Sequence, residues 1–152
     1  MISITGIPGS GKSSVCNILK KLGFDCKNVL DMEGAKICLE GEEMDIDCLK
    51  ERLNRDIYNG TIIEGHYSHL LGCSEIFILE RDEEIVREVM RTRGYSEEKI
   101  NENIDALRSD IIYQESLDLL PASRIHRIQV EEGNPEITAK IIVDLIKGGK
   151  KD

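Results

Sequence analysis

The sequence predicts an α/β fold in which about five parallel strands form one sheet with helices on both faces. Short apolar runs alternate with amphipathic stretches, turn-forming residues separate many of them, and no repeat or linker divides the chain. At 152 residues the chain fits one domain and is long enough to bury a core without metal or disulfide support. We therefore expect a single domain over residues 1–152.

The first half of the chain is expected to form three strands and two helices. Runs rich in β-prone residues at positions 2–5, 24–29 and 61–63 predict the strands. Leu49, Leu53 and Ile57 recur every four residues and predict a helix over residues 47–58, while residues 40–47 hold five carboxylates and are expected to be solvated and mobile. The earlier helix starts at Lys12 and stops before Gly23, because apolar residues recur at helical spacing: Val15, Ile18, Leu19 and Leu22.

The second half adds two strands and three helices. Residues 75–80 and 125–130 predict the strands. A helix reaches Arg93, Gly94-Tyr95 interrupts it, and another begins at Ser96. Pro135 suits the start of a last helix, since its missing N–H is not needed there. The expected inward residues are Ile85, Val86, Val89 and Met90 in the first of these helices, Ile100, Ile104, Leu107 and Ile111 in the second, and Ile137, Ile141, Ile142 and Leu145 in the last.

Charge and cysteine content narrow the possible classes of protein. The chain has 20 basic and 29 acidic residues, a formal net charge of −9, which argues against nucleic-acid binding without sequence preference. No apolar run approaches the length of a membrane-spanning helix, and the N-terminus lacks the pattern of a signal peptide. We therefore expect a cytoplasmic protein with no membrane partner, and we expect its five cysteines to be reduced thiols because no C-x-x-C pair is present.

Residues 6–13 match the phosphate-binding motif G-x-x-x-x-G-K-[ST] in full, between a predicted strand and a predicted helix. Glycines such as Gly9 and Gly11, with Ser10 between them, allow successive backbone N–H groups to point at phosphate oxygens. Lys12 supplies a positive charge for the terminal phosphates of ATP, Ser13 offers a hydroxyl to Mg²⁺, and Ser14 can reach the α-phosphate. ATP and Mg²⁺ are therefore the expected cofactors.

Glu64 and His66 follow the predicted strand at residues 61–63, at the sheet edge where ligands of such folds bind. Glu64 could hold the hydration shell of Mg²⁺, or it could be a solvent-facing acid. His66 could contact phosphate or position a nucleophile, or it could be a structural histidine.

Arg93 lies between two helices beside Gly94, where a hinged arginine could neutralise the charge that develops during phosphoryl transfer. The alternative is a basic helix end favoured by the helix dipole. Asn134, in a turn before Pro135, could line the adenine through its backbone, or the turn could be only structural. No N-K-x-D motif of GTPases is present, which leaves small kinases and small ATPases.

The chain resembles the atypical adenylate kinase family of archaea and eukaryotic nuclei, the adenylate kinase isoenzyme six type. The resemblance rests on the motif at residues 6–14, on Ile63-Glu64-Gly65-His66, and on residues 92–100 with Asn103 beyond them. It implies ATP + AMP ⇌ 2 ADP with Mg²⁺, tolerance of other nucleoside monophosphates, and a slow ATPase. It also implies a role in small-subunit ribosome maturation, through a ribosomal protein of the platform.

By this resemblance Gly9, Gly11, Lys12, Ser13 and Ser14 would hold ATP, residues 28–51 would bind the monophosphate, and residues 92–102 would form a lid that carries Arg93. One departure concerns the acceptor phosphate. Residues 28–51 contain no arginine, although arginine suits phosphate well. Lys36, Lys50, Arg52 or Arg55 would have to replace it.

The lack of arginine in residues 28–51 and the acidic surface support a second hypothesis. In it the protein is an ATP-gated ribosome assembly factor that binds a basic ribosomal protein, and phosphotransfer is incidental. A third is a kinase for another small acceptor.

Overall fold

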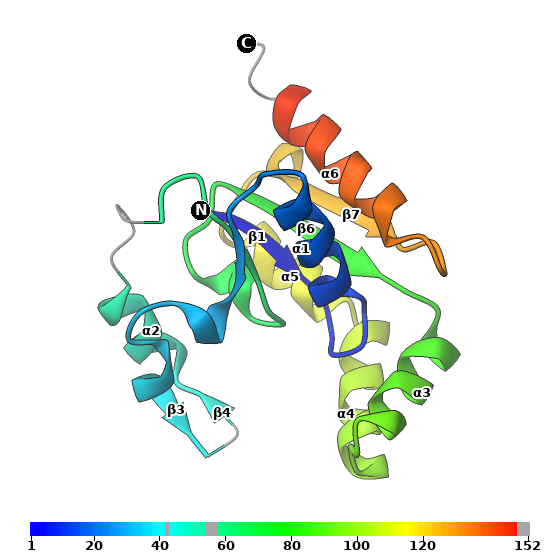
Figure 1. Ribbon diagram of the computed structural model, residues 1–152. Helices are drawn as coiled ribbons and strands as arrows, with labels where there is room; N and C mark the ends of the chain where they lie inside the picture. Colours follow the sequence, from blue (N-terminus) through cyan, green and yellow to red (C-terminus); the bar gives the residue numbers. More distant parts are fainter. Residues whose placement is uncertain (42, 54–57, 149–152) are drawn as a thin grey trace.

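The chain forms one five-stranded parallel sheet with helices on both faces, as the sequence predicts, in a computed structural model that describes residues 1–41, 43–53 and 58–148 (Figure 1). The strand order is β2-β5-β1-β6-β7, and every neighbouring pair is parallel. The strands are β1 (Ile2–Thr5), β2 (Cys26–Asn28), β5 (Ile62–Glu64), β6 (Glu75–Glu80) and β7 (Ile125–Gln129).

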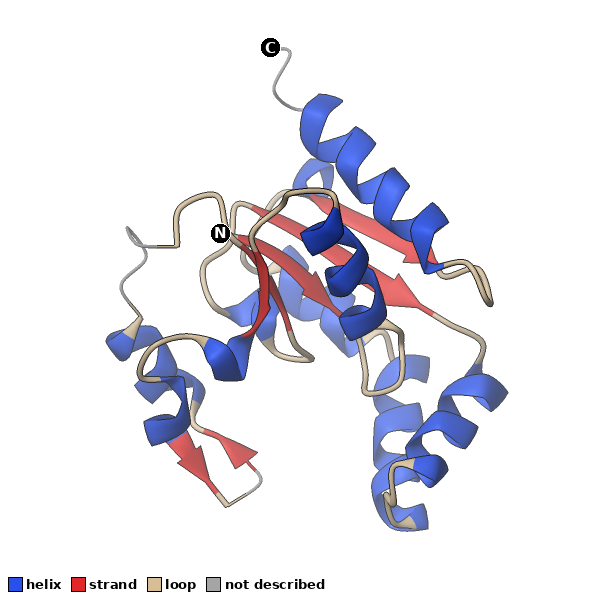
Figure 2. Ribbon diagram, in the orientation of Figure 1, coloured by secondary structure: helices blue, strands red, loops and turns tan. Residues whose placement is uncertain are grey.

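One face of the sheet is covered by α1 (Lys12–Lys21) and α6 (Pro135–Gly148) (Figure 2). The other face packs on α5 (Ile111–Leu117) and the 3₁₀ turn Ser68–Leu70. Alternation along β6 explains the two layers, because Phe77 and Leu79 join the first core and Ile76 and Ile78 join the second.

In β1 the polar residues alternate with isoleucines and lie buried on the second face. Ser3 Oγ and Ser68 Oγ share a hydrogen bond of 2.6 Å, and Thr5 Oγ1 lies 3.1 Å from His69 Nδ1. His69 also contacts Glu115, although burial still lowers the pKa of the imidazole. These bonds satisfy groups whose burial would otherwise be unfavourable, and they fix the strand that leads into residues 6–13.

Two peripheral units lie on opposite sides of the carboxyl edge of the sheet (Figure 1). The first contains the antiparallel pair β3 (Leu39–Glu40) and β4 (Glu43–Met44) with α2 (Ile46–Arg52). The second contains α3 (Glu83–Thr92) and α4 (Glu97–Arg108), which pack together around Val86, Met90, Ile100 and Ile104. Ile7, from the loop after β1, belongs to the same apolar cluster, which couples that loop to the second unit.

The peripheral elements differ in part from the sequence predictions. The acidic segment 40–47 is solvated as expected at its described carboxylates, but it also contains regular structure: β3 pairs with β4, and Asp45 Oδ1 caps α2 by accepting from Cys48 N at 3.0 Å. The helix predicted over 47–58 ends at Arg52, where Leu53 is already extended. Ile57 and Arg55 lie outside the described residues.

Two predicted helix faces also differ from the structure. The helix from Ser96 does not continue to Ile111, because Asp110 adopts a left-handed conformation and accepts two hydrogen bonds from Arg127. In α6 the buried side is formed by Thr138, Ala139 and Ile142. The apolar residues of this helix span too wide an arc for one sheet to cover, which leaves three of the four expected inward residues about 40% exposed: Ile137, Ile141 and Leu145.

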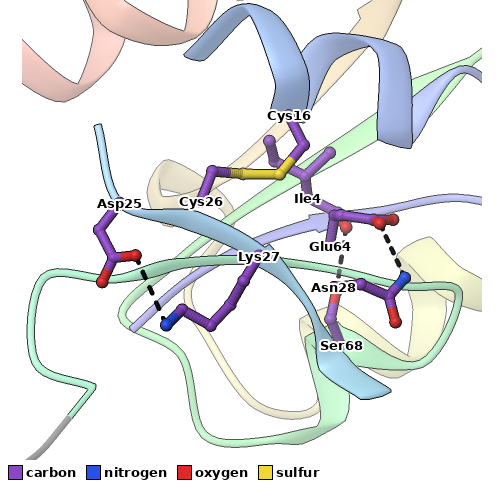
Figure 3. Close-up of a disulfide and its surroundings, with 8 residues drawn as sticks. All are labelled: Ile4, Cys16, Asp25, Cys26, Lys27, Asn28, Glu64 and Ser68. Carbon is purple, nitrogen blue, oxygen red and sulfur yellow. Dashed lines mark hydrogen bonds and ion pairs between the residues drawn. A yellow bond between two sulfur atoms is a disulfide. The ribbon is translucent and has the colours of Figure 1, made fainter. Parts of the chain in front are cut away.

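The cysteines also differ from the expectation of five thiols. Cys16 of α1 is joined to Cys26 of β2 (Figure 3), and Cys38 is joined to Cys48 of α2. In each pair the Cα atoms lie 5.6 Å apart, within the range that a disulfide spans. The cysteines come close because α1 packs on β2 and α2 packs on the turn Ala35–Cys38. A search for C-x-x-C motifs does not detect such pairs, because their proximity arises from tertiary packing.

No helix within the described ranges combines the length and hydropathy needed to cross a bilayer.

Candidate active site

The loop between β1 and α1 forms a cradle whose shape depends on glycine. Gly6 has φ of +150°, and a Cβ there would lie 2.6 Å from Ser10 Oγ and 2.8 Å from Leu79 O. Gly11 precedes α1 with φ of +98°, and no side chain caps the first N–H groups of the helix. Those donors and the positive end of the helix dipole suit an anion.

Lys12 occupies the centre of the cradle with its ammonium group buried. Its Nζ donates to Gly6 O and Ile7 O at 2.9 Å each, so carbonyl oxygens of the loop surround the ammonium group. Burial lowers the pKa of Lys12 to about 8; nearby Glu64 opposes this shift and Arg93 adds to it. Phosphate oxygens would replace the carbonyl partners and favour the charged form.

Glu64 is the last residue of β5, which lies between β1 and β2. It is in register with Ile4 of β1 and Asn28 of β2. Glu64 is only 5% exposed as a residue, and its Oε1 accepts from Asn28 Nδ2 at 2.7 Å (Figure 3). Asn28 Oδ1 in turn accepts from Leu30 N at 2.8 Å, which fixes the orientation of the amide. The structure therefore does not support the alternative that Glu64 is a solvent-facing acid.

His66 lies at the mouth of the cradle, and its ring stacks edge-on against Tyr67 at 4.6 Å. Partial burial lowers the pKa of His66 to about 4, and the positive charge of Lys12 lowers it further than burial alone would. At neutral pH the imidazole is therefore uncharged and can accept a proton or a hydrogen bond.

Two adjacent cavities surround these residues. The first, called here the loop cavity, has a volume of about 270 Å³. It is lined by Pro8, Gly9, Gly11, Lys12, Ser13, Asn28, Glu64, Gly65, His66, Arg93 and Tyr95. The second, called the junction cavity, has about 680 Å³ and lies between the two peripheral units. It is lined by Pro8, Glu43, Met44, Ile46, His66, Tyr67, Arg93, Gly94, Tyr95, Ser96, Lys99 and Asn103. Pro8, His66, Arg93 and Tyr95 belong to both, so the cavities adjoin at these residues.

The structure brings most of the predicted site residues together in the loop cavity and leaves three out of its lining. Ser10 is buried within the loop, with Oγ 3.4 Å from Lys12 Nζ. Ser14 and Asn134 are exposed and line neither the loop cavity nor the junction cavity. Their proposed contacts with ATP stay predictions.

Sequence reasoning missed Arg81, which follows β6 at the same edge of the sheet. Arg81 Nη1 donates to Gly9 O at 2.9 Å, while its other nitrogens bind both carboxylate oxygens of Glu132 at 2.7 Å. This pair ties the phosphate-binding loop to the segment after β7. Its position directly after a predicted strand was the available signal. Asn28 and Tyr95 were included only within broader segments.

A P-loop cradle at the carboxyl edge of this parallel sheet defines a nucleotide-binding protein of the P-loop kinase class. Residues 2–110 match the family described as "AAA domain". Shikimate kinase from Acinetobacter baumannii has a similar fold, with a TM-score of 0.67 at 18% identity over 99% of this chain and 94% of that one.

Similar sequences give a closer assignment. Proteins named "Putative adenylate kinase" are 52% identical over 129 residues in Thermoplasma acidophilum, covering 85% of this chain and 86% of the relative, and 48% identical over 149 residues in Thermoplasma volcanium, covering 98% and 95%. A protein of the same name in Pyrococcus abyssi is 34% identical over 157 residues, covering 99% and 86%. The chain belongs to the AAA-domain family and, within it, to this group of archaeal adenylate kinase-like proteins, which confirms the resemblance found in its sequence.

Proposed function

We propose that the protein transfers the γ-phosphoryl group of ATP to a nucleoside monophosphate, with AMP as the preferred acceptor, so that ATP and AMP form two ADP. The observation that carries this proposal is the pair of adjoining cavities, one built around the phosphate-binding loop and the other large enough for a nucleotide. The names of the archaeal relatives support the same reaction.

In this reaction the donor phosphates would lie in the loop cavity, against the N-terminus of α1 and Lys12. Arg93 faces both cavities from the α3–α4 junction, where its guanidinium could neutralise charge on the phosphoryl group in transit. Because Gly94 follows it with φ of +84°, the junction can turn sharply at this point. His66 would orient the acceptor phosphate as a neutral hydrogen-bonding group.

Mg²⁺ fits the donor set of the loop cavity. Ser13 offers a hydroxyl, and Glu64 offers a buried carboxylate held by Asn28, while no group of three or more metal-binding side chains occurs in the described part of the chain. Mg²⁺ commonly binds to one or two protein oxygens plus substrate phosphates and water, which matches this sparse arrangement. The ion would neutralise phosphate charge.

A panel of acceptors with Mg-ATP tests the proposal. We expect ADP to form faster with AMP than with GMP, CMP, UMP or shikimate, and faster than in the absence of an acceptor. ADP release that is equal with and without AMP would contradict the proposed reaction. Acceleration by a non-nucleotide hydroxyl compound alone would favour a kinase for another small acceptor.

A second candidate function is an ATPase that assists small-subunit ribosome assembly in the cytoplasm by binding a basic ribosomal protein. The exposed charges of residues 28–51 favour it, because exposed carboxylates outnumber exposed lysines among the described residues of this segment. The exposed carboxylates are those of Asp31, Glu33, Glu40, Glu43, Asp45, Asp47 and Glu51. Purified small-subunit platform proteins, tested with and without Mg-ATP, should bind in an ATP-dependent manner. Absence of binding in both states would count against this function.

A further inference from the structure

The junction cavity has an uneven distribution of charge. On the side of β4 and α2 its lining consists of Glu43, Met44 and Ile46, which offer a carboxylate and apolar surface but no cation. On the opposite side Arg93 and Lys99 provide two positive charges. A bound monophosphate therefore meets its cations on the α3–α4 side.

The backbone of Lys99 is fixed at the start of α4, on the cation-bearing side of the junction cavity. Lys99 lies in the first turn of α4, where its backbone N–H donates to Ser96 Oγ at 3.1 Å. Lys99 lines the junction cavity together with His66, and its ammonium charge is among those that lower the pKa of the imidazole.

The other cations of this unit are already paired with carboxylates. Arg91 binds Glu88 and Glu97, and Arg108 binds Glu83. Among the residues that the structure describes, neither Arg93 nor Lys99 has a carboxylate partner within 4 Å. Their charges are therefore available to an anionic ligand.

We infer that Lys99 binds the phosphate of the acceptor nucleotide, from the lid side, in the place of the arginine that residues 28–51 lack. This inference rests on the proposed function and assigns the orientation of its second substrate. The phosphate points to α4, and the nucleoside lies toward Met44 and Glu43, whose carboxylate can accept hydrogen bonds from amino or hydroxyl groups and repels phosphate.

The candidates expected from the sequence are placed less suitably. Lys36, Lys50 and Arg52 are not part of the lining of the junction cavity, and Arg55 lies outside the described residues. Lys36 is an exposed lysine of residues 28–51, so Lys36→Ala removes one lysine charge from another exposed site and serves as a matched control for Lys99→Ala.

Equilibrium binding of AMP, measured by calorimetry without ATP, tests the assignment independently of turnover. We expect Lys99→Ala to weaken AMP binding about tenfold or more, Lys99→Arg to restore most of the affinity, and Lys36→Ala to bind as the wild type does. In steady-state assays the KM for AMP of Lys99→Ala should rise by a similar factor while the KM for ATP changes less than about twofold. Because Lys99 is exposed, the thermal midpoint should not change.

The outcomes separate this inference from the proposed reaction. Unchanged AMP affinity in Lys99→Ala, in an enzyme that makes ADP from AMP, would overturn the role of Lys99 and leave the reaction standing. Binding of AMP that depends on Lys99, without any ADP formed, would support the inference and contradict the reaction. A wild-type chain that does not bind AMP would overturn both.

Discussion

Reduction of the two disulfides is a perturbation whose effect on stability can be worked out from the structure. Cys16–Cys26 and Cys38–Cys48 each join residues ten positions apart. The loss of loop entropy in the unfolded chain stabilises a protein by about 3 kcal/mol for a loop of this length at 25 °C. Reduction of both is therefore expected to lower the free energy of unfolding by up to about 6 kcal/mol, a large share of the stability of a typical domain.

Thiol titration and urea unfolding together measure this effect. Protein unfolded without reductant should show one thiol per chain, that of Cys73, and five after reduction. The urea midpoint, followed by circular dichroism, should fall when dithiothreitol is present. Five thiols before reduction, or equal midpoints with and without reductant, would refute the reasoning.

The two disulfides should differ in their effect on activity. Cys38–Cys48 bridges the segment that supplies Glu43, Met44 and Ile46 to the junction cavity, whereas Cys16–Cys26 joins α1 to the sheet. A Cys38→Ala/Cys48→Ala variant is therefore expected to raise the KM for AMP more than the KM for ATP. A larger change in the KM for ATP would contradict this assignment.

Four further predictions concern the phosphate-binding loop and Glu64. Gly6→Ala should lower the free energy of unfolding by about 2 kcal/mol or more and weaken ATP binding, because the new Cβ would lie 2.8 Å from Leu79 O. Gly34→Ala is the control: the space around Gly34 is open, so this variant should lose less stability in thermal melts. At pH 8.5, Mg-ATP binding should be accompanied by uptake of roughly three quarters of a proton, because the pKa of Lys12 is about 8 before binding and the bound phosphate raises it. Calorimetric titrations in buffers of different ionisation enthalpy measure the number of protons taken up. A binding enthalpy that does not depend on the buffer would contradict this prediction. Stability without nucleotide should rise with pH between about 8 and 10.5, since the unfolded lysine keeps its proton longer, and a flat profile would contradict that pKa. Glu64→Gln should lower kcat about a hundredfold with little change in the urea midpoint, and near wild-type kcat would remove its role.

The sequence predicts the parts of the fold that depend on local patterns. Alternating apolar runs predict the sheet, and the spacing of Gly6, Gly11 and Lys12 predicts the cradle. Glu64 and His66 could be predicted because the carboxyl ends of parallel strands share one edge.

Other features depend on which strands become neighbours, which local patterns do not encode. Asn28 reaches Glu64 only because β2 lies beside β5, and Arg81 reaches Gly9 only because β6 lies beside β1. The pairing of Cys16 with Cys26 likewise follows from the packing of α1 on β2. Lys99 was included in the lid by resemblance, but its availability becomes clear only when the ion pairs of its neighbours are known.

Calorimetry with Mg-ATP is the most direct test of the claim that the loop after β1 holds the triphosphate of the donor. The wild-type protein should show saturable heat of binding below millimolar nucleotide, and Lys12→Ala should show none. A Lys140→Ala variant, which removes an exposed lysine of α6, should bind as the wild type does. Equal affinity in the wild type and Lys12→Ala, or no saturable binding by the wild type, would contradict the account.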